Sequence, residues 1–156
     1  MKKTALFISL ILFMAIPVFA DDMETAKQNF TNYVYAANNY SPSLLNYYSP
    51  NAKIIRQVVK PDGSTVNATT DMATYAKQMK ISQSTAKMRK YKNKYKNVSA
   101  TRVANGIKVS SLRQPMDDNY WLQTYQIWQK QPNGNWVIIE EMMQTKQQIF
   151  LHYADK

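Results

Sequence analysis

The segment from residue 119 to residue 145 constrains the fold of this chain most strongly, because it holds all three tryptophans and has two strand-like halves. Asn133-Gly134 lies between the halves and is a preferred pair for a type I′ turn, in which both central residues have positive φ. Such a turn places residue 125 opposite 142, 127 opposite 140, 129 opposite 138 and 131 opposite 136. The segment is therefore predicted to form a long β-hairpin.

In this register both faces of the hairpin are largely apolar. One face carries Trp121, Tyr125, Ile127, Trp136, Ile138, Glu140 and Met142, and the other carries Leu122, Trp128, Val137, Ile139, Glu141 and Met143. A sheet that shows one side to water instead alternates apolar and polar residues. We therefore expect the sheet to be covered on both faces.

The first 20 residues are typical of a secretory signal peptide. Two lysines precede an apolar run from residue 5 to residue 16, and residues 18–20 read Val-Phe-Ala, which suits a cleavage site. We expect cleavage before Asp21 and a periplasmic or secreted mature chain, residues 21–156, with the length of a single domain. The alternative is an uncleaved membrane anchor, although the run is shorter than the roughly 20 residues of a spanning helix. No later stretch approaches that length, so no transmembrane segment is expected after cleavage.

The composition limits the chemistry that this chain can perform. It has no cysteine, a single histidine (His152) and a net charge of +10. Without cysteine there is no disulfide framework, so an exported chain must be stabilised by packing alone. Zinc and iron sites need several imidazole, thiolate or carboxylate ligands, and we expect no metal and no cofactor. The positive charge favours anionic partners, such as the surface of a cell envelope.

Residues 87–96 form a basic run in which Tyr91 and Tyr95 lie between lysines. A basic strand with interleaved aromatic residues is one way to hold a polyanion, such as a nucleic acid or lipopolysaccharide. The alternative is an exposed strand whose lysines prevent pairing at a sheet edge. Export from the cytoplasm disfavours nucleic acid as a partner.

Apolar residues at three- and four-residue intervals predict helices in the first half of the chain. One helix is expected from Asp21 to Asn39, and Ser41-Pro42 is expected to begin a short second helix. A third helix is expected after Thr69 or Thr70, and residues 82–85 are expected to be a polar connector. Its inner face is predicted to carry Met72, Tyr75, Ala76 and Met79.

Strand signals outside the long hairpin lie at residues 52–68 and 90–113. Residues 52–68 predict a short hairpin with a proline-initiated turn at 61–63 (Pro-Asp-Gly). Residues 90–103 and 107–113 predict two strands that are joined at Asn105-Gly106. The residues after Thr145 are predicted to extend the last strand.

This order of elements resembles the nuclear-transport-factor-2-like superfamily, which includes polyketide-cyclase-like and ketosteroid-isomerase-like proteins. The resemblance rests on the helix-to-strand step Tyr47-Tyr48-Ser49-Pro50-Asn51-Ala52, the Pro-Asp-Gly turn and the terminal Asn-Gly-Asn-Trp-Val-Ile, and covers residues 23–145. It implies an α+β, cystatin-like fold in which a strongly curved antiparallel sheet wraps around three helices from the N-terminal half. It also implies a cone-shaped pocket and frequent dimerisation through the outer sheet face.

The first candidate function is binding, either of a small apolar ligand in the pocket or of a partner chain on the sheet. The predicted pocket residues are Tyr33, Tyr47, Tyr75, Trp121, Tyr125, Ile138, Glu140 and Met142. The alternative for each aromatic residue is that it fills the core and leaves its hydroxyl at the rim.

The second candidate function is that of a small-molecule isomerase, cyclase or hydrolase. Glu140 and Glu141 are the only acidic residues in the middle of a predicted strand, and Glu140 shares a face with Tyr125. A carboxylate beside an apolar wall can act as a general base, so Glu140 and Tyr125 are the catalytic candidates. The alternatives are a structural role for Glu140, or a register that differs by one residue. A third candidate is an envelope secretion or assembly module of the same fold.

A homodimer is expected from the second apolar face of the hairpin. Three short helices can cover only one face of a long sheet, and large exposed apolar patches usually mark an interface. The face left uncovered would carry Trp128, Val137, Ile139 and Met143. We expect two copies to pack sheet to sheet about a two-fold axis, with Trp128 and Ile139 near its centre.

Mass spectrometry of protein recovered from the periplasm or the medium is expected to show Asp21 as the first residue, because signal peptidase requires the small residue at position 20. The matched control is Ala20→Trp, which should remain uncleaved. An intact Met1 on wild-type protein in the membrane fraction would refute the signal peptide.

Overall fold

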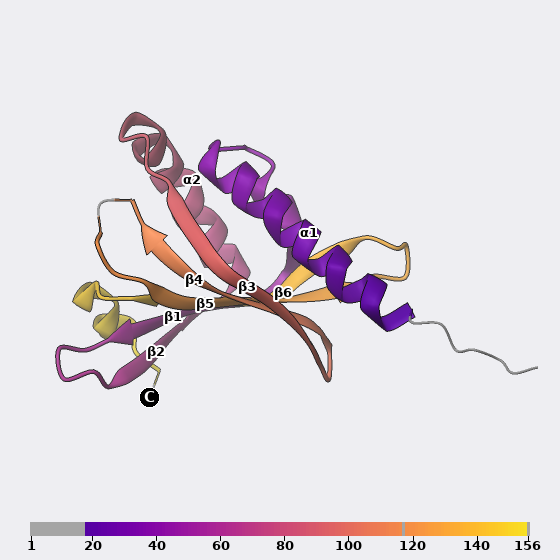
Figure 1. Cartoon of the computed structure of the whole chain (residues 1–156). Coiled ribbons are helices and arrows are strands. Elements are labelled where there is room, and N and C mark those ends of the chain that lie inside the picture. Colours follow the sequence, from indigo (N-terminus) through magenta and orange to yellow (C-terminus); the bar gives the residue numbers. More distant parts are fainter. Residues whose placement is uncertain (1–17, 117, 156) are drawn as a thin grey trace, which may run out of the picture.

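The chain forms one curved sheet with two long helices on the same side, as Figure 1 shows for the computed structural model. The structure describes residues 18–116 and 118–155. Its elements are α1 (Val18–Asn38), η1 (Leu44–Tyr47), β1 (Tyr48–Val59), β2 (Thr65–Thr70), α2 (Met72–Met88), β3 (Asn93–Val103), β4 (Gly106–Pro115), β5 (Leu122–Lys130), β6 (Trp136–Thr145) and η2 (Gln148–Tyr153). The predicted signal peptide lies almost wholly outside the described residues.

The six strands form a single sheet in the order β2-β1-β6-β5-β4-β3. All neighbouring strands are antiparallel except β1 and β6, which are parallel and place Ile54 beside Glu141 and Arg56 beside Met143. The predicted fold class is therefore confirmed, with the correction that the sheet is mixed. The parallel pair brings the first and last strands together, which local sequence patterns cannot indicate.

The core lies between the inner face of the sheet and the helices. Helix α1 packs on β3 and β4, and α2 packs on β1. Their apolar residues recur every three or four positions, which places them on one side of each helix. The buried core includes Ala26, Phe30, Tyr33, Leu44, Tyr48, Ile54, Ile107, Val109, Trp128 and Ile138. Each large side chain contributes about 1.5–3 kcal/mol by leaving water.

The turn of the long hairpin has three residues, Pro132, Asn133 and Gly134, and is not the predicted type I′ turn. Gly134 has φ of +85°, whereas Asn133 is not among the described residues with positive φ. Gln131 N–H donates to the Asn135 carbonyl at 2.7 Å, and Gly134 N–H donates to the Gln131 carbonyl at 2.9 Å. Proline fixes a negative φ at the first position, which favours a type I turn followed by a left-handed glycine.

A β-bulge between β5 and β6 changes the predicted register on the turn side of the hairpin. Tyr125 lies opposite Met142, as predicted, but Trp128 lies opposite Ile138 and Gln129 opposite Val137. Alternation along a strand is interrupted at a bulge, so residues on its two sides exchange faces.

Independently of the bulge, the face that was predicted to lie outside, with Trp128 and Met143, is the inner face of the sheet, so the predicted assignment of the two faces was wrong. Trp128 is fully buried in the core beneath the helices, and Met143 lines the inner side of the sheet. Ile138 is also a core residue rather than a pocket residue. Of the residues predicted for the dimer interface, Val137 and Ile139 remain only partly buried.

Three other element boundaries differ from the sequence-based expectation. Helix α2 continues through residues 82–85, and its N-cap is Asp71, whose carboxylate accepts from Thr74 N–H at 2.8 Å. Strand β1 already begins at Tyr48. The tail does not extend β6 but forms η2, and Asp155 N–H donates to the Asn67 carbonyl of β2 at 2.8 Å.

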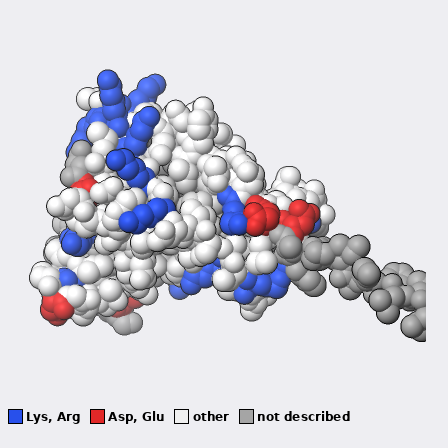
Figure 2. Space-filling model, viewed as in Figure 1, with Lys and Arg blue, Asp and Glu red and all other residues white. Residues whose placement is uncertain are grey.

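The basic run extends over a turn and a strand rather than along one strand. Lys90 has φ of +53° and precedes β3, whereas Lys94 and Lys96 lie in β3 and are exposed. Lysine and arginine side chains gather over the end of α2 and the beginning of β3, at the upper left of Figure 2. Of the lysines in this run, Lys94 and Lys96 therefore lie on the strand, and Lys90 and Lys92 precede it.

Candidate functional site

A cavity of about 520 Å³ lies between α1, α2 and the inner face of the sheet. Its described lining includes the aromatic residues Tyr33, Tyr40, Tyr75, Tyr91, Tyr95 and Phe150, the apolar residues Ala37, Leu44, Met79, Ile81, Ala86 and Met143, and the basic residues Arg56, Arg89 and Arg113. This volume is within the roughly 300–1,000 Å³ of small-molecule sites.

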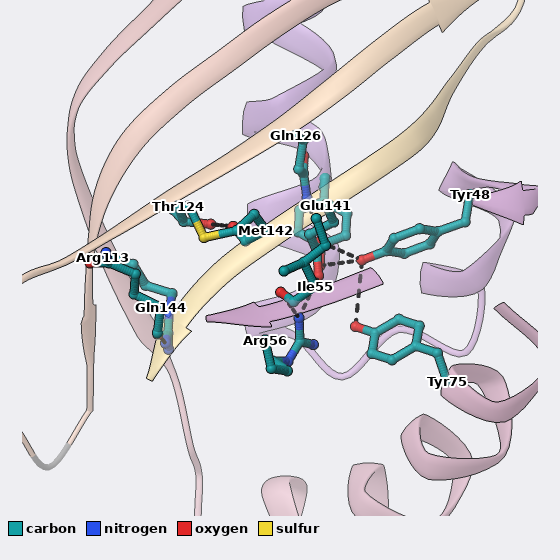
Figure 3. Close-up of polar contacts among 11 residues, drawn as sticks. Tyr48, Ile55, Arg56, Tyr75, Arg113, Thr124, Gln126, Glu141, Met142 and Gln144 are labelled. Carbon is teal, nitrogen blue, oxygen red and sulfur yellow. Dashed lines mark hydrogen bonds and ion pairs between the residues drawn. The ribbon is translucent and has the colours of Figure 1, made fainter. Parts of the chain in front are cut away.

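A fully buried carboxylate, that of Glu141, lies beneath the cavity (Figure 3). Its Oε2 accepts hydrogen bonds from Tyr48 Oη at 2.6 Å, Gln126 Nε2 at 2.9 Å and Tyr33 Oη at 3.2 Å. Its Oε1 accepts from Arg56 Nη1 at 3.3 Å, which is also an ion pair. Tyr33 is in helix α1, whereas the other three donors are in strands β1 and β5 of the sheet. The carboxylate therefore joins the helix layer to the sheet.

Arg56 connects this buried carboxylate to the cavity. Its guanidinium lies 5.3 Å from the centre of the Tyr75 ring, and its side chain is 19% exposed. Burial alone would lower the pKa of Arg56, but interactions with Tyr75 and Glu141 outweigh burial and raise the pKa above its ordinary value. The guanidinium therefore stays charged where it lines the cavity.

The tyrosines around Glu141 are held in their neutral form. Burial, and then the negative charge of Glu141, raise the pKa of Tyr33 and that of Tyr48 well above the ordinary value. The same causes raise the pKa of Tyr75, whose hydroxyl is 3.5 Å from Tyr48 Oη. At neutral pH these hydroxyl groups are protonated, so they can donate to the carboxylate.

Glu141 is poorly placed to act as a general base toward a ligand. Its two oxygens already accept four hydrogen bonds, and Glu141 is not among the residues that line the cavity. A general base needs to reach the proton that it removes. The carboxylate instead holds Arg56 and the tyrosines in position.

Of the predicted pocket residues, Tyr33 and Tyr75 line the cavity. Tyr47 lies behind this wall, where its ring meets those of Tyr33 and Trp128 edge to face, with centroids 5.8 and 6.2 Å away. Trp121 is outside the cavity, and Lys96 Nζ is 4.0 Å from the centre of its ring.

The predicted catalytic pair, Glu140 and Tyr125, is adjacent in the structure but lies on the outer face of the sheet. Tyr125 Oη donates to Glu140 Oε1 at 2.7 Å. Burial, and then this hydrogen bond, raise the pKa of Tyr125. Tyr125 and Met142 line a separate shallow hollow of about 280 Å³ that also contains Lys108.

Sequence reasoning missed Arg56 and Arg113, and it singled out both Glu140 and Glu141 without deciding which of them lies in the inner site. One signal was present, because Thr124 and Gln126 place polar groups on the inner face of β5, where a core strand is usually apolar. Buried polar residues need partners. Arg56, within the apolar run of β1, gave a second signal of the same kind.

Within residues 18–116 and 118–155, no group of three or more histidine, cysteine, aspartate or glutamate residues could hold a metal ion. In the same part of the chain, no helix is long and apolar enough to cross a membrane.

No protein-family model matches this sequence, and no curated protein matches it by sequence. Solved structures do match. An NTF2-like (nuclear-transport-factor-2-like) protein of unknown function from Pseudomonas putida is 10% identical, with a TM-score of 0.58 over 80% of this chain and 87% of that chain.

Two further solved structures have the same fold. An NTF2-like protein with a cystatin-like fold from Novosphingobium aromaticivorans is 9% identical, with a TM-score of 0.54 over 82% of this chain and 84% of that chain. A candidate dehydratase of the NTF2-like family from Streptomyces avermitilis is 9% identical, with a TM-score of 0.57 over 80% of this chain and 96% of that chain. The resemblance seen in the sequence is therefore confirmed at the level of the fold.

Replacing Glu141 by glutamine is expected to lower the free energy of unfolding by about 3–5 kcal/mol, because the buried Arg56 guanidinium loses its counterion. The matched control is Glu140→Gln, which replaces the charged acceptor of one hydrogen bond on the outer face by a neutral amide oxygen and should cost no more than about 1 kcal/mol. Urea unfolding followed by tryptophan fluorescence measures both. Equal losses would show that the buried network does not anchor the fold.

Proposed function

We propose that this protein, which has the nuclear-transport-factor-2-like fold, binds a small and largely apolar organic molecule in the cavity between α1, α2 and the sheet. The observation that carries the proposal is the cavity itself, about 520 Å³ with mixed aromatic, aliphatic and basic walls. Pockets of this size and lining are the usual sites of small-molecule binding.

The walls of the cavity are suited to an organic ligand. Aliphatic side chains such as Leu44, Met79 and Met143 supply apolar contact, and asparagine and glutamine side chains add polar contacts. The floor is held by the hydrogen bonds of Glu141, which fix Tyr33 and Arg56. A wall held in advance loses little conformational entropy when a ligand binds.

Binding is favoured over acid–base catalysis. The pair Glu140–Tyr125 lies on the opposite side of the sheet from the cavity, and the oxygens of Glu141 are occupied by four donors. The candidate dehydratase with the same fold supports ligand binding in such a cavity but assigns no reaction to this chain.

We also propose that the protein acts in the periplasm or outside the cell, on the basis of the signal-like first 20 residues. The basic surface over the end of α2 and the beginning of β3 would then face an anionic envelope. An envelope-assembly role would use the same location, with a partner chain bound to the outer sheet face.

A second copy of this chain is the partner that we propose for the outer sheet face. Leu112, Tyr125 and Ile127 point outward from β4 and β5 and are only partly buried. Leu112 and Tyr125 line a hollow on this face that a side chain from another copy could fill. The centre of the interface therefore shifts from Trp128 to these residues.

Filling the cavity is expected to abolish ligand binding. Ala86→Trp adds a large ring at a residue that lines the cavity, whereas Ala73→Trp adds the same ring at an exposed position of the same helix. Displacement of a fluorescent apolar probe and thermal stabilisation by apolar compounds measure binding. Ala73→Trp should bind as the wild type does, and Ala86→Trp should not. Equal binding by both variants would contradict the proposed site.

Sedimentation of the mature chain at micromolar concentration is expected to show a dimer. The double variant Leu112→Glu, Ile127→Glu should be a folded monomer, because it places charges on the outer face and leaves the core unchanged. The control is Tyr35→Glu, which changes an exposed aromatic residue on α1. A wild-type monomer would overturn the dimer and leave the ligand proposal untouched.

A further inference from the structure

The described lining of the cavity is basic. Among its described lining residues three are arginines, Arg56, Arg89 and Arg113, and none is aspartate or glutamate. Residues 72–116 contain eleven lysines and arginines and no acidic residue, and two aspartates, Asp117 and Asp118, follow them. Charge of a single sign around a cavity attracts ligands of the opposite sign.

Arg56 and Arg113 differ in how their charge is balanced. Arg56 forms an ion pair with Glu141, which neutralises it from below the cavity. Arg113 forms no ion pair with any described residue; its Nη1 donates to Asn93 Oδ1 and its Nη2 to the Gln144 carbonyl, both at 2.9 Å. The charge of Arg113 is therefore held by neutral acceptors only.

Arg113 is also buried. Its side chain projects from the inner face of β4, the residue is 8% exposed, and Nε has no hydrogen-bond partner in the described part of the chain. Figure 3 shows its guanidinium beside Gln144, apart from the cluster around Glu141. A buried cation without a counterion is costly, and a ligand that supplies the counterion recovers that cost.

A second polar group of the cavity lacks a partner. The hydroxyl of Tyr40 is buried, lines the same cavity and has no hydrogen-bond partner among the described residues. Buried polar groups are almost always satisfied in folded proteins. Two such groups in one cavity indicate a polar ligand group that completes them.

We propose that the ligand is an organic carboxylate with an apolar body, such as a medium-chain fatty acid, and that Arg113 binds its carboxylate. This inference rests on the proposed function of the cavity and names its ligand class. The planar guanidinium matches a carboxylate, and five N–H donors leave three for a ligand once two neutral acceptors are served. The aliphatic walls then contact the hydrocarbon body.

The surface around the cavity supports the same charge preference. Arg89, Tyr91 and Asn93 line the cavity where α2 ends and β3 begins, and this is where lysine and arginine side chains gather in Figure 2. Such a surface speeds the arrival of an anion and is screened by salt, whereas contacts inside the cavity are screened much less.

The test compares three probes of the same length, decanoate, methyl decanoate and 1-decanol, by displacement of a fluorescent apolar probe from the mature protein at pH 8. Decanoate is expected to bind at least about tenfold more tightly than the two neutral probes, because only it forms charged hydrogen bonds. Arg113→Gln should reduce the affinity for decanoate to that for decanol and leave decanol unchanged. The control, Arg102→Gln, removes a charge outside the cavity and should keep the wild-type preference.

The outcomes separate this inference from the function on which it rests. Equal affinity of wild-type protein for all three probes would overturn the carboxylate and leave small-molecule binding intact. No binding of any probe, with no stabilisation by other apolar compounds, would overturn both. If Arg113→Gln fails to fold, the wild-type comparison of decanoate with its methyl ester still decides the question. A preference for decanoate that disappears in 300 mM salt would assign binding to the surface lysines and refute the role of Arg113.

Discussion

The buried carboxylate of Glu141 is the interaction on which the arrangement of this fold depends. Hydrophobic burial is not directional, so apolar contacts alone would hold the helices on the sheet without fixing their positions. Glu141 accepts from Tyr33 of α1, Tyr48 at the start of β1 and Arg56 further along the same strand. Tyr75 of α2 reaches this group through Tyr48. Hydrogen bonds have preferred directions, and these connect both helices to one point on the sheet.

This anchoring explains how a cavity persists beside a packed core. Protein interiors normally close around voids, because each lost contact costs dispersion energy. Here a satisfied polar group, the Glu141 carboxylate, lies beneath the cavity, and the guanidinium of Arg56 faces the cavity from one side. The same layer contains two arginines with different tasks. Arg56 balances the charge of the Glu141 carboxylate, whereas Arg113 donates only to neutral acceptors, so its charge is available to the proposed ligand.

Much of the fold could be predicted from the sequence because its signals are local. The helical periodicity of residues 21–39, the turn residues at 61–63 and 133–134 and the resemblance to the nuclear-transport-factor-2-like superfamily all indicated the observed α+β architecture. The parallel pairing of β1 with β6 is not local, and it is this pairing that brings Arg56 near Glu141. The inner site therefore could not be predicted, although the two residues were visible as charges in apolar strands.

Glu140 and Glu141 pair as predicted, opposite Ile127 and Gln126, so the prediction failed in which face of the hairpin lies inward and not in the register of these two residues. A three-residue turn without a bulge would place Glu140 opposite Gln126, because residues 130 and 136 are paired next to the turn. The bulge at Ile139 adds one residue to β6 and places Glu141 opposite Gln126 instead. The predicted turn is one residue shorter than the observed turn, and the predicted β6 lacks the extra residue of the bulge. These two differences cancel, so Tyr125 lies opposite Met142 in both registers.

The sequence could not reveal this compensation, since Ile138-Ile139 and Glu140-Glu141 are doublets that look the same after a shift of one residue. Only the burial of the carboxylate among the tyrosine hydroxyls distinguishes the two glutamates. An unpaired carboxylate in the core would be costly, and Tyr33, Tyr48 and Arg56 supply the partners of Glu141. Given a three-residue turn, it is the bulge at Ile139 that places Glu141 opposite Gln126.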